Sequence, residues 1–236
     1  MEIAPVRYDF HTHTQYSNDS LMDPRKLVTL AMARGLSGVA VTDHDSVAGG
    51  LEAQALAPRG FHVIVGSEVA TTAGDIVGLF LQYDVSTRDP LGAIAGIHEQ
   101  GGLAFLPHPL RGHRGLTDAV LDAVDAYETL NGRAGWFRPS DGGAPAVDWS
   151  LLGSKPALGC TDAHLYRELG GVWTDLTGPA TEDGVRDAFR TGQVQARGAP
   201  GPEGNFYRSQ LIKLVKTRDW RMLLRAGRRV FRSLGS

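Results

Sequence analysis

Two histidines at the end of the first apolar run of the chain have a spacing that can bind a metal ion. The segment Val6-Arg7-Tyr8 alternates apolar and polar residues as a β-strand does, and His11 and His13 follow it. Side chains two residues apart on a strand point to the same side, so the two imidazoles project together from the strand end. Two imidazoles in this arrangement can chelate one divalent metal ion.

Polar residues able to bind a metal also follow four later apolar runs, each of which reads as a short buried strand. These segments are Thr42-Asp43-His44-Asp45, Gly66-Ser67-Glu68, Pro107-His108-Pro109 and Thr161-Asp162-Ala163-His164. Helical stretches alternate with the strands: Asp23 before Pro24 predicts a helix start, and Thr181 predicts another. Units of strand and helix close into barrels whose functional side chains gather at the C-terminal ends of the strands. We therefore expect these residues to share one site, the alternative being scattered turn residues.

Taken together, the five segments resemble the signature of the polymerase-and-histidinol-phosphatase (PHP) superfamily, and they occur in that family's order. The resemblance covers residues 6–200 in round numbers. It implies an α/β fold of a single domain, a distorted (β/α)7 TIM-like barrel. It also implies two or three divalent metal ions at the C-terminal ends of the strands, with Mn, Zn or Fe expected and Mg possible. Members of this superfamily hydrolyse phosphoesters.

The resemblance also implies which residue binds which metal ion. The first ion would be held by His11, His13, Glu68 and Asp162. Glu68 would bridge to a second ion that His108 also binds. The third ion would be held by His44, His164 and Asp19. For Asp19, a turn or helix-capping role is an equal alternative.

One position departs from the family pattern. Many relatives have a histidine just before a strand similar to residues 76–79, where this chain has Asp75. A carboxylate at this position can still bind a hard cation such as Mn²⁺ or Mg²⁺, and it disfavours a nitrogen-rich zinc site. The alternative is a turn residue and a more weakly bound second ion.

Three acidic residues are expected to take part in the chemistry. Clustered metal ions lower the pKa of a bound water, so that hydroxide exists near neutral pH, and they neutralise charge on a phosphate. Glu68, as the bridging ligand, is expected to hold two ions around that hydroxide. Asp43 and Asp45 flank His44, and one of them is expected to accept a hydrogen bond from a ligand imidazole and fix its tautomer.

Two arginines are the expected phosphate-binding residues. Arg111 lies three residues after His108, and Arg133 follows the apolar strand 126–130. A guanidinium can contact two phosphate oxygens at once, which a lysine ammonium cannot. Asn131 and Arg133 belong to an Asn-Gly-Arg stretch that resembles part of the substrate-binding rim of the family.

Length and composition fit one enzyme-sized barrel. The chain has 236 residues, 42% of them apolar, and a net charge of −2. A single cysteine, Cys160, excludes an internal disulfide framework and fits a reducing compartment. No signal-like apolar segment follows Met1, and no apolar run reaches the ~18 residues that a membrane span needs. We expect a cytoplasmic protein without a transmembrane segment.

The charge is unevenly distributed along the chain. Residues 205–236 carry nine Lys and Arg residues and one acidic residue, a net charge of +8, so that residues 1–204 carry −10. We expect a barrel over residues 1–198, a linker over 199–204 and a basic amphipathic helical segment over 205–236. That segment can pack on the barrel, lie on an anionic membrane or contact a nucleic acid. No feature of the sequence indicates an oligomeric state.

These observations favour a metal-dependent phosphoesterase that acts on small phosphate esters through a metal-activated hydroxide. The compact chain carries none of the polymerase domains that accompany this motif in large replicases. It resembles small stand-alone members that act on nucleotides or short oligonucleotides. Histidinol phosphate and phosphotyrosine are alternative substrates. A non-catalytic metal-binding module, or a nuclease whose basic tail binds a polynucleotide, are the alternative classes.

Overall fold

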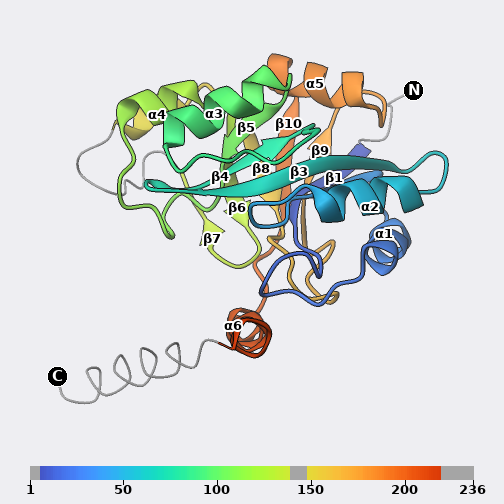
Figure 1. Ribbon diagram of the computed structural model, residues 1–236. Coiled ribbons are helices and arrows are strands. Elements are labelled where there is room, and N and C mark those ends of the chain that lie inside the picture. Colours follow the sequence, from blue (N-terminus) through green and yellow to red (C-terminus); the bar gives the residue numbers. More distant parts are fainter. Residues whose placement is uncertain (1–5, 139–147, 219–236) are drawn as a thin grey trace.

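Short apolar runs of the sequence form the strands of one curled sheet, and helices cover its outer side (Figure 1). The computed structural model describes residues 6–138 and 148–218. The strands are β1 (Val6–Thr12), β2 (Gly38–Val41), β3 (His62–Thr71), β4 (Gly74–Leu79), β5 (Leu103–Leu106), β6 (Ala126–Asn131), β7 (Gly135–Trp136), β8 (Ala157–Cys160), β9 (Val172–Leu176) and β10 (Val194–Gly198). The helices are α1 (Pro24–Ala33), α2 (Ala48–Leu56), α3 (Pro90–Glu99), α4 (Asp118–Ala123), the 3₁₀ turn η2 (Trp149–Leu152), α5 (Glu182–Thr191) and α6 (Gly204–Thr217).

The sheet follows the order β10-β9-β1-β2-β3-β4-β5-β6-β7, and β8 pairs with β6. Pairing is parallel between β1 and β2, β2 and β3, β5 and β6, and β6 and β8. The strand β4 runs antiparallel to both of its neighbours, β3 and β5. This reversed strand distorts the ring formed by β1 to β6 and β8. The predicted single-domain α/β fold with a distorted barrel is confirmed.

The ring closes between β1 and the end of β8 through a few specific contacts. The first half of β1 pairs antiparallel with β9, so only its second half is free to face β8. There, Thr12 and Ala163 form a bridge, and the backbone N–H of His13 donates to the carbonyl of Ala163 at 2.9 Å. The Asp9 carboxylate accepts a hydrogen bond from the backbone N–H of Thr161 at 3.0 Å. These contacts place the end of β1 beside the segment that follows β8.

Helix starts follow the predicted capping residues. The Asp23 side chain accepts a hydrogen bond from the backbone N–H of Lys26 at 2.9 Å, and Pro24 opens α1. The hydroxyl of Thr181 accepts one from the backbone N–H of Gly184 at the start of α5. Local sequence therefore sets where these helices begin, and each helix connects one strand to the next.

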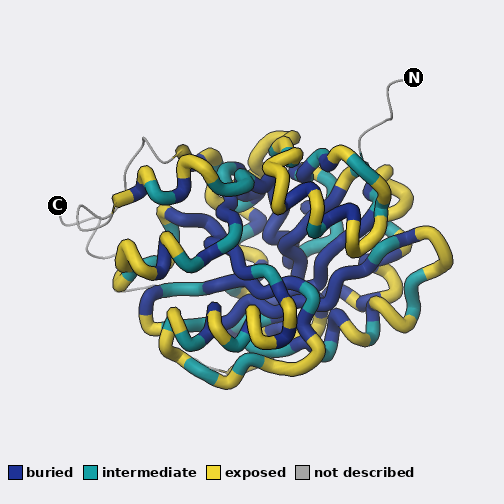
Figure 2. The backbone as a smooth tube through the Cα atoms, turned by 90° about the horizontal axis from the view of Figure 1, so that it is seen from above, coloured by how far each residue is buried: buried dark blue, intermediate teal, exposed yellow. Residues whose placement is uncertain are grey.

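Large apolar side chains of the strands form a continuous core below the strand ends. Tyr8 and Phe10 stack with ring centroids 5.3 Å apart, and Phe10 meets Phe189 of α5 edge to face. Phe105 and Ile64 are fully buried in the same cluster. Figure 2 shows that buried residues follow the strands, whereas exposed ones lie on the helices and loops. Burying one such side chain contributes about 1.5–3 kcal/mol, so the strand ends rest on a well-packed base.

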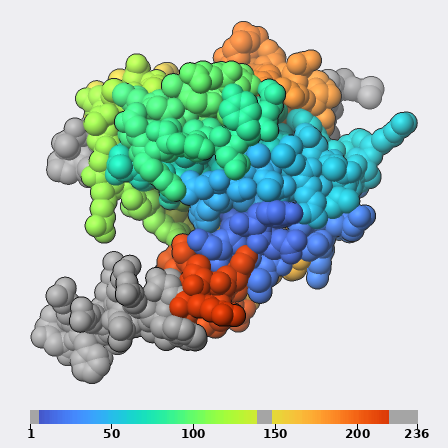
Figure 3. Space-filling model, in the orientation of Figure 1, coloured from blue at the N-terminus to red at the C-terminus, as the bar shows by residue number. Residues whose placement is uncertain are grey.

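The C-terminal part of the described chain is a helix that lies against the N-terminal part of the molecule (Figure 3). A helix was predicted after residue 204, and α6 occupies residues 204–217. The remainder of the predicted basic segment, residues 219–236, lies outside the described residues. No helix within residues 6–138 or 148–218 is long and apolar enough to cross a membrane. The division into barrel, linker and tail stays a prediction.

Candidate metal centre

Eight of the nine predicted ligands converge in three adjoining groups at one end of the barrel. In each group the possible ligand atoms lie within 4.8 Å of one another. The groups are His11, His13 and Asp162; Glu68, Asp75 and His108; and His13, His44 and His164. Asp75 reaches this end although it stands at the start of β4, because β4 runs antiparallel to β3. Asp19, the ninth, lies beside the third group.

The first group has the dimensions of a tetrahedral site. The Nε2 atoms of His11 and His13 are 3.1 Å apart. Oε2 of Glu68 is 3.5 Å and 3.4 Å from these two nitrogens, and Oδ1 of Asp162 is 3.7 Å and 3.4 Å from them. Ligands about 2.1 Å from a tetrahedral ion are about 3.4 Å from one another. The four side chains therefore fit one divalent ion.

Glu68 is placed to bridge two ions. Its second oxygen, Oε1, lies 3.1 Å from Nε2 of His108, and Asp75 completes that group. The mixed set of one imidazole and two carboxylates suits a hard or borderline cation. The predicted ligand role of Asp75 is thus compatible with its position.

The buried carboxylate of Asp19 lies beside the third group. Oδ2 of Asp19 lies 3.4 Å from Nε2 of His44, and Oδ1 lies 3.2 Å from Nε2 of His164. Oδ1 is buried and makes no hydrogen bond. A buried carboxylate oxygen that has an ion-pair contact but no hydrogen bond is incompletely satisfied, and a bound cation would lower that cost. Asp19 therefore fits a ligand better than a helix cap.

The cluster holds opposite charges out of water. Burial lowers the pKa of His11 and His44, but the surrounding carboxylates, Glu68 foremost, together outweigh this effect and raise both well above their ordinary value. Burial raises the pKa of Glu68, and His11 and His44 reverse this and hold it well below its usual range. His13 differs, because burial and then His164 and His44 lower its pKa to about 3. In the metal-free protein, protons on some imidazoles balance the carboxylates.

Two of the predicted ligands have a backbone conformation that is rare for residues other than glycine. His108 has φ of 29° and Asp162 has φ of 54°, and each follows a strand closely. Such left-handed conformations cost about 1–3 kcal/mol and are concentrated at functional sites. The strained turn at His108 is held by a hydrogen bond of 2.7 Å from its backbone N–H to Glu128.

Glu128 of β6 is a central residue that the sequence reading did not single out. Its Oε1 lies 2.8 Å from Nδ1 of His11, and its Oε2 accepts hydrogen bonds from the backbone of His108 and the amide of Asn131, both at 2.7 Å. A carboxylate on Nδ1 fixes the tautomer that leaves Nε2 free for a metal. The available signal was a lone acidic residue in the apolar strand 126–130.

Substituting Glu128 by glutamine is expected to weaken metal binding by about 10–100-fold, the usual effect of losing such an outer partner. Glutamine has the same volume but only one acceptor oxygen. In the native protein His11, His108 and Asn131 share the two carboxylate oxygens of Glu128. Titration of metal-stripped protein with Mn²⁺ measures the change. Glu99→Gln, at an exposed position at the end of α3, is the matched control. Equal affinity in the Glu128 and Glu99 variants would contradict the assigned role.

Asp43 orients a ligand histidine through an intervening serine. Its buried carboxylate accepts hydrogen bonds from the backbone and hydroxyl of Thr14 and from the backbone and hydroxyl of Ser17. Oγ of Ser17 lies 3.0 Å from Nδ1 of His13. Because the serine proton points to Asp43, the serine oxygen accepts from Nδ1–H of His13. Asp43 thus acts indirectly on the imidazole of His13, and the same serine oxygen accepts a hydrogen bond from the backbone N–H of His44 at 3.1 Å.

Asp45 is engaged away from the metal cluster. Its carboxylate accepts hydrogen bonds from the backbone N–H of Ala70 at 3.0 Å and from Arg88. The side chain is 38% exposed. The described contacts of Asp45 therefore anchor the loop after β2 to β3, and the predicted hydrogen bond to an imidazole is not formed.

The predicted phosphate-binding arginines line one pocket with the metal-binding side chains. This pocket has a volume of about 170 Å³ and includes Arg111 and Arg133 together with Glu68 and His108. Asn131 is 1% exposed and lies below the pocket. Its Oδ1 accepts hydrogen bonds from the backbone N–H groups of Arg133 and Ala134, both at 2.8 Å. Asn131 thus shapes the turn that carries Arg133, and the structure does not place it in the pocket wall.

Arg133 is a buried guanidinium with several protein partners. Its Nη1 lies 2.8 Å from Nδ1 of His164, and its Nε lies 3.3 Å from Glu168. Its Nη2 donates to Oγ of Ser209 and to the carbonyl of Asn205, both in α6. Arg133 therefore connects the third ligand group to the C-terminal helix. Arg111 has its guanidinium 4.5 Å above the ring of Phe206.

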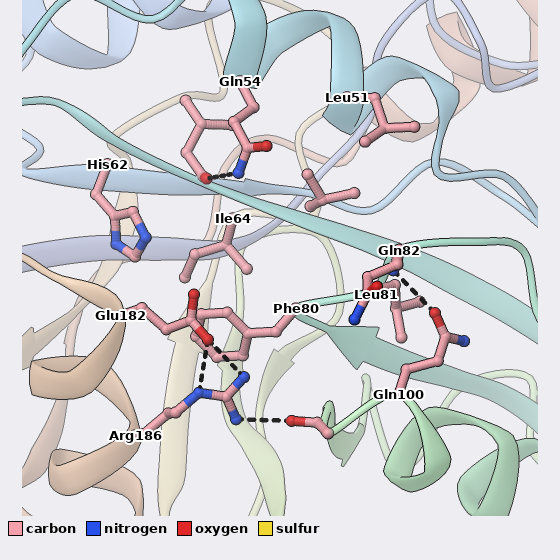
Figure 4. Close-up of a pocket in the computed structure, with 13 residues that line it drawn as sticks. Leu51, Gln54, His62, Ile64, Phe80, Leu81, Gln82, Gln100, Glu182 and Arg186 are labelled. Carbon is pink, nitrogen blue, oxygen red and sulfur yellow. Dashed lines mark hydrogen bonds and ion pairs between the residues drawn. The ribbon is translucent and has the colours of Figure 1, made fainter.

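A larger cavity of about 360 Å³ lies elsewhere, between α2, α5, the strand β3 and the segments that follow β4 and α3. Figure 4 shows that its charged groups are paired with each other: Glu182 binds Arg186 at 2.7 Å, and Arg186 also donates to the carbonyl of Gly101. Arg186 also stacks on Phe80. Its charged groups are satisfied, so this cavity is not the candidate active site.

Metal binding is expected to tighten as the pH rises towards 9. Burial lowers the pKa of His108, but its hydrogen bond to Glu68 and the charges of the nearby carboxylates together outweigh this and raise the pKa to about 9. Below that pH a metal must displace the proton, so its affinity increases with pH until His108 is neutral. Calorimetry in buffers of different ionisation enthalpy counts the protons released. Binding that releases no proton at pH 7 would contradict this prediction.

The metal-free protein should show the opposite trend in stability. The folded pKa of His108 is raised above its ordinary value of 6.5, so the ion pair with Glu68 stabilises the fold fully below pH 6.5. That contribution is lost as the pH rises through about 9. Thermal unfolding of stripped protein between pH 6.5 and 9 tests this.

Comparison with known proteins places the chain in a family. Residues 9–135 match the model of the PHP domain, and residues 146–194 match that of the PHP-associated region. The chain is 38% identical over 140 residues to an uncharacterized protein of Methanocaldococcus jannaschii, covering 53% of this chain and 82% of that protein. It is 30% identical over 193 residues to an error-prone DNA polymerase of Cutibacterium acnes, covering 80% of this chain and 13% of the polymerase.

Two solved structures share the fold. A protein of Bifidobacterium adolescentis, inferred to be a metal-dependent phosphoesterase, superposes with a TM-score of 0.53 at 18% identity, covering 80% of this chain and 96% of that one. PsfC of Pseudomonas syringae superposes with a TM-score of 0.60 at 15% identity, covering 90% of this chain and 99% of that one. The PHP domain match spans more than half of the residues and includes seven of the nine predicted ligands. The chain therefore belongs to the PHP domain family, as its five sequence segments predicted.

Proposed function

We propose that this protein is a phosphoesterase that hydrolyses small phosphate esters with the help of two or three bound divalent metal ions. The convergence of the three ligand groups, two of which share His13 and all of which adjoin Glu68, supports this most directly. A cluster of this kind beside a pocket lined by arginines suits a phosphate better than an uncharged ester. Mn, Zn or Fe fits the mixed nitrogen and oxygen ligands, and Mg is possible.

The candidate ligands, the residues that orient them and the pocket arginine Arg111 each have a defined task in this proposal. Bound metal ions would supply a water of lowered pKa and would neutralise the phosphate charge. Glu68 would hold the ligand atoms of adjoining groups together. Glu128 keeps Nε2 of His11 available, and the Asp43–Ser17 pair does the same for His13. Arg111 would contact substrate phosphate oxygens at the pocket wall, next to the metal-binding side chains.

For the substrate, we favour a nucleotide or a short oligonucleotide. A 5′-3′ exoribonuclease of Haemophilus influenzae is 39% identical over 66 residues, covering 28% of this chain and 24% of that protein. Together with the polymerase, this relative links the sequence pattern to nucleic-acid chemistry. Histidinol phosphate and phosphotyrosine are the alternative esters. The single, buried Cys160 favours work in a reducing compartment.

A phosphate-release assay tests the proposal. Metal-stripped protein would receive Mn²⁺, Zn²⁺, Fe²⁺ or Mg²⁺ and then nucleoside 5′- and 3′-monophosphates, a short oligonucleotide, histidinol phosphate or phosphotyrosine. We expect metal-dependent turnover that is highest with one nucleotide class. Bound metal without turnover of any ester would favour the non-catalytic module and overturn the proposal.

A further inference from the structure

Helix α6 is anchored across the metal pocket from its C-terminal end. Nζ of Lys216 donates to the carbonyl oxygens of Gln15, Ser17 and Ser20, at 2.7 Å, 2.6 Å and 3.1 Å. These carbonyls belong to the loop after β1, which also carries Asp19. One ammonium group therefore holds the helix to the loop that shapes the third ligand group.

A second anchor fixes the N-terminal half of α6. The ring of Phe206 packs against the guanidinium groups of Arg111 and Arg133, at 4.5 Å and 5.7 Å from its centroid. Arg133 also donates to the hydroxyl of Ser209. With both halves attached, α6 has a set position against the N-terminal part of the molecule (Figure 3), and two of its residues line the pocket.

This position brings a third cation into the pocket. Lys213 and Gln210 of α6 line the pocket together with the metal-binding side chains and the two arginines. Nζ of Lys213 lies 3.8 Å from Oδ2 of Asp19, which is too long for a hydrogen bond, and the side chain is 33% exposed. Its ammonium donors are therefore available to a ligand in the pocket.

We infer that Lys213 binds the substrate phosphate and that α6 is the outer wall of a subsite for a terminal phosphate. This inference rests on the proposed function and narrows it to phosphomonoesters. The dianionic group of a monoester matches Lys213 and Arg111 beside bound metals better than the single charge of an internal diester. The volume of about 170 Å³ is also below the ~300 Å³ of sites that enclose drug-sized ligands.

The test uses the metal-loaded full chain and inorganic phosphate as the probe. Lys213→Met removes the charge and keeps a helix-forming side chain, Lys213→Arg keeps the charge, and Arg208→Met removes an exposed charge from the same helix. We expect the phosphate dissociation constant, measured by calorimetry, to rise about tenfold in Lys213→Met, as for the loss of a charge-assisted hydrogen bond. The other two variants should stay within about twofold of the parent protein.

A second readout measures substrate class. The ratio of kcat/KM for p-nitrophenyl phosphate to that for bis-p-nitrophenyl phosphate should fall in Lys213→Met and recover in Lys213→Arg. Phosphate binding in Lys213→Met that equals that of the parent protein would overturn the inference. A loss of bound metal in this variant would also overturn it, because the role of Lys213 would then be to hold Asp19 in place. Failure of the proposed function looks different, since the parent protein itself would then lack metal-dependent turnover.

Discussion

Glu68→Gln is expected to reduce metal-dependent turnover by about a thousand-fold, because losing metal-based charge stabilisation removes several kcal/mol from the transition state. One oxygen of Glu68 lies within 3.5 Å of His11 and His13 and 2.9 Å from His44. The other lies 3.1 Å from His108. The amide of glutamine keeps the volume but turns N–H donors towards positions that a cation needs.

Bound metal per chain, measured by mass spectrometry after dialysis, should fall together with the activity. Glu99→Gln provides the control for a charge change far from the cluster. Thermal unfolding of both variants without metal shows whether the fold is retained. A Glu68→Gln protein that keeps both its metal and its turnover would show that Glu68 neither bridges ions nor holds the ligand groups together.

His13→Ala is expected to lower turnover by a similar factor of about a thousand, since the ions it helps to hold carry the charge stabilisation. His13 belongs to two of the three ligand groups, one with His11 and Asp162 and one with His44 and His164. Its pKa is lowered to about 3, so its Nε2 lone pair is available without loss of a proton at neutral pH. Removing the His13 imidazole is therefore expected to weaken metal binding at both of these ligand groups.

The matched control is His98→Ala, which removes an exposed imidazole that pairs with Asp125 outside the cluster. Metal content should fall in His13→Ala and stay at the parent value in His98→Ala. Parent-like metal content and turnover in His13→Ala would contradict the assigned site. Added imidazole that restores part of the activity would support a ligand role over a purely structural one.

The sequence alone was sufficient to nominate candidate ligands, because most of them are local features of one strand, and their role in binding metal stays a prediction. His11 and His13 share a face through the two-residue period of a strand, and Glu68, His108 and Asp162 each follow an apolar run. Parallel strands bring such ends to one edge of a barrel whatever the details of packing. Capping signals such as Asp23 and Thr181 are local as well, and they set the helix starts.

Only the tertiary structure decided the residues that support and surround these ligands. Glu128 reaches His11 across 117 positions of sequence, and nothing in its own strand indicates that partner. Asp43 acts on His13 through Ser17, and Asp45 turns away to Arg88, although both flank the same histidine. The left-handed backbone at Asp45 helps to explain how neighbouring side chains reach different partners.

The C-terminal helix shows most clearly the difference between what the sequence predicts and what only the tertiary structure decides. The sequence predicted a basic helical segment over residues 205–236, of which the structure describes α6 up to Thr217, but a helical pattern allows packing, membrane contact and nucleic-acid contact alike. Its position over the pocket depends on Lys216 meeting carbonyls about 200 residues earlier in the chain, and on Phe206 meeting two arginines. Periods within a strand or helix are local and readable from the chain, whereas docking between distant segments depends on shape and charge that exist only once the barrel has closed.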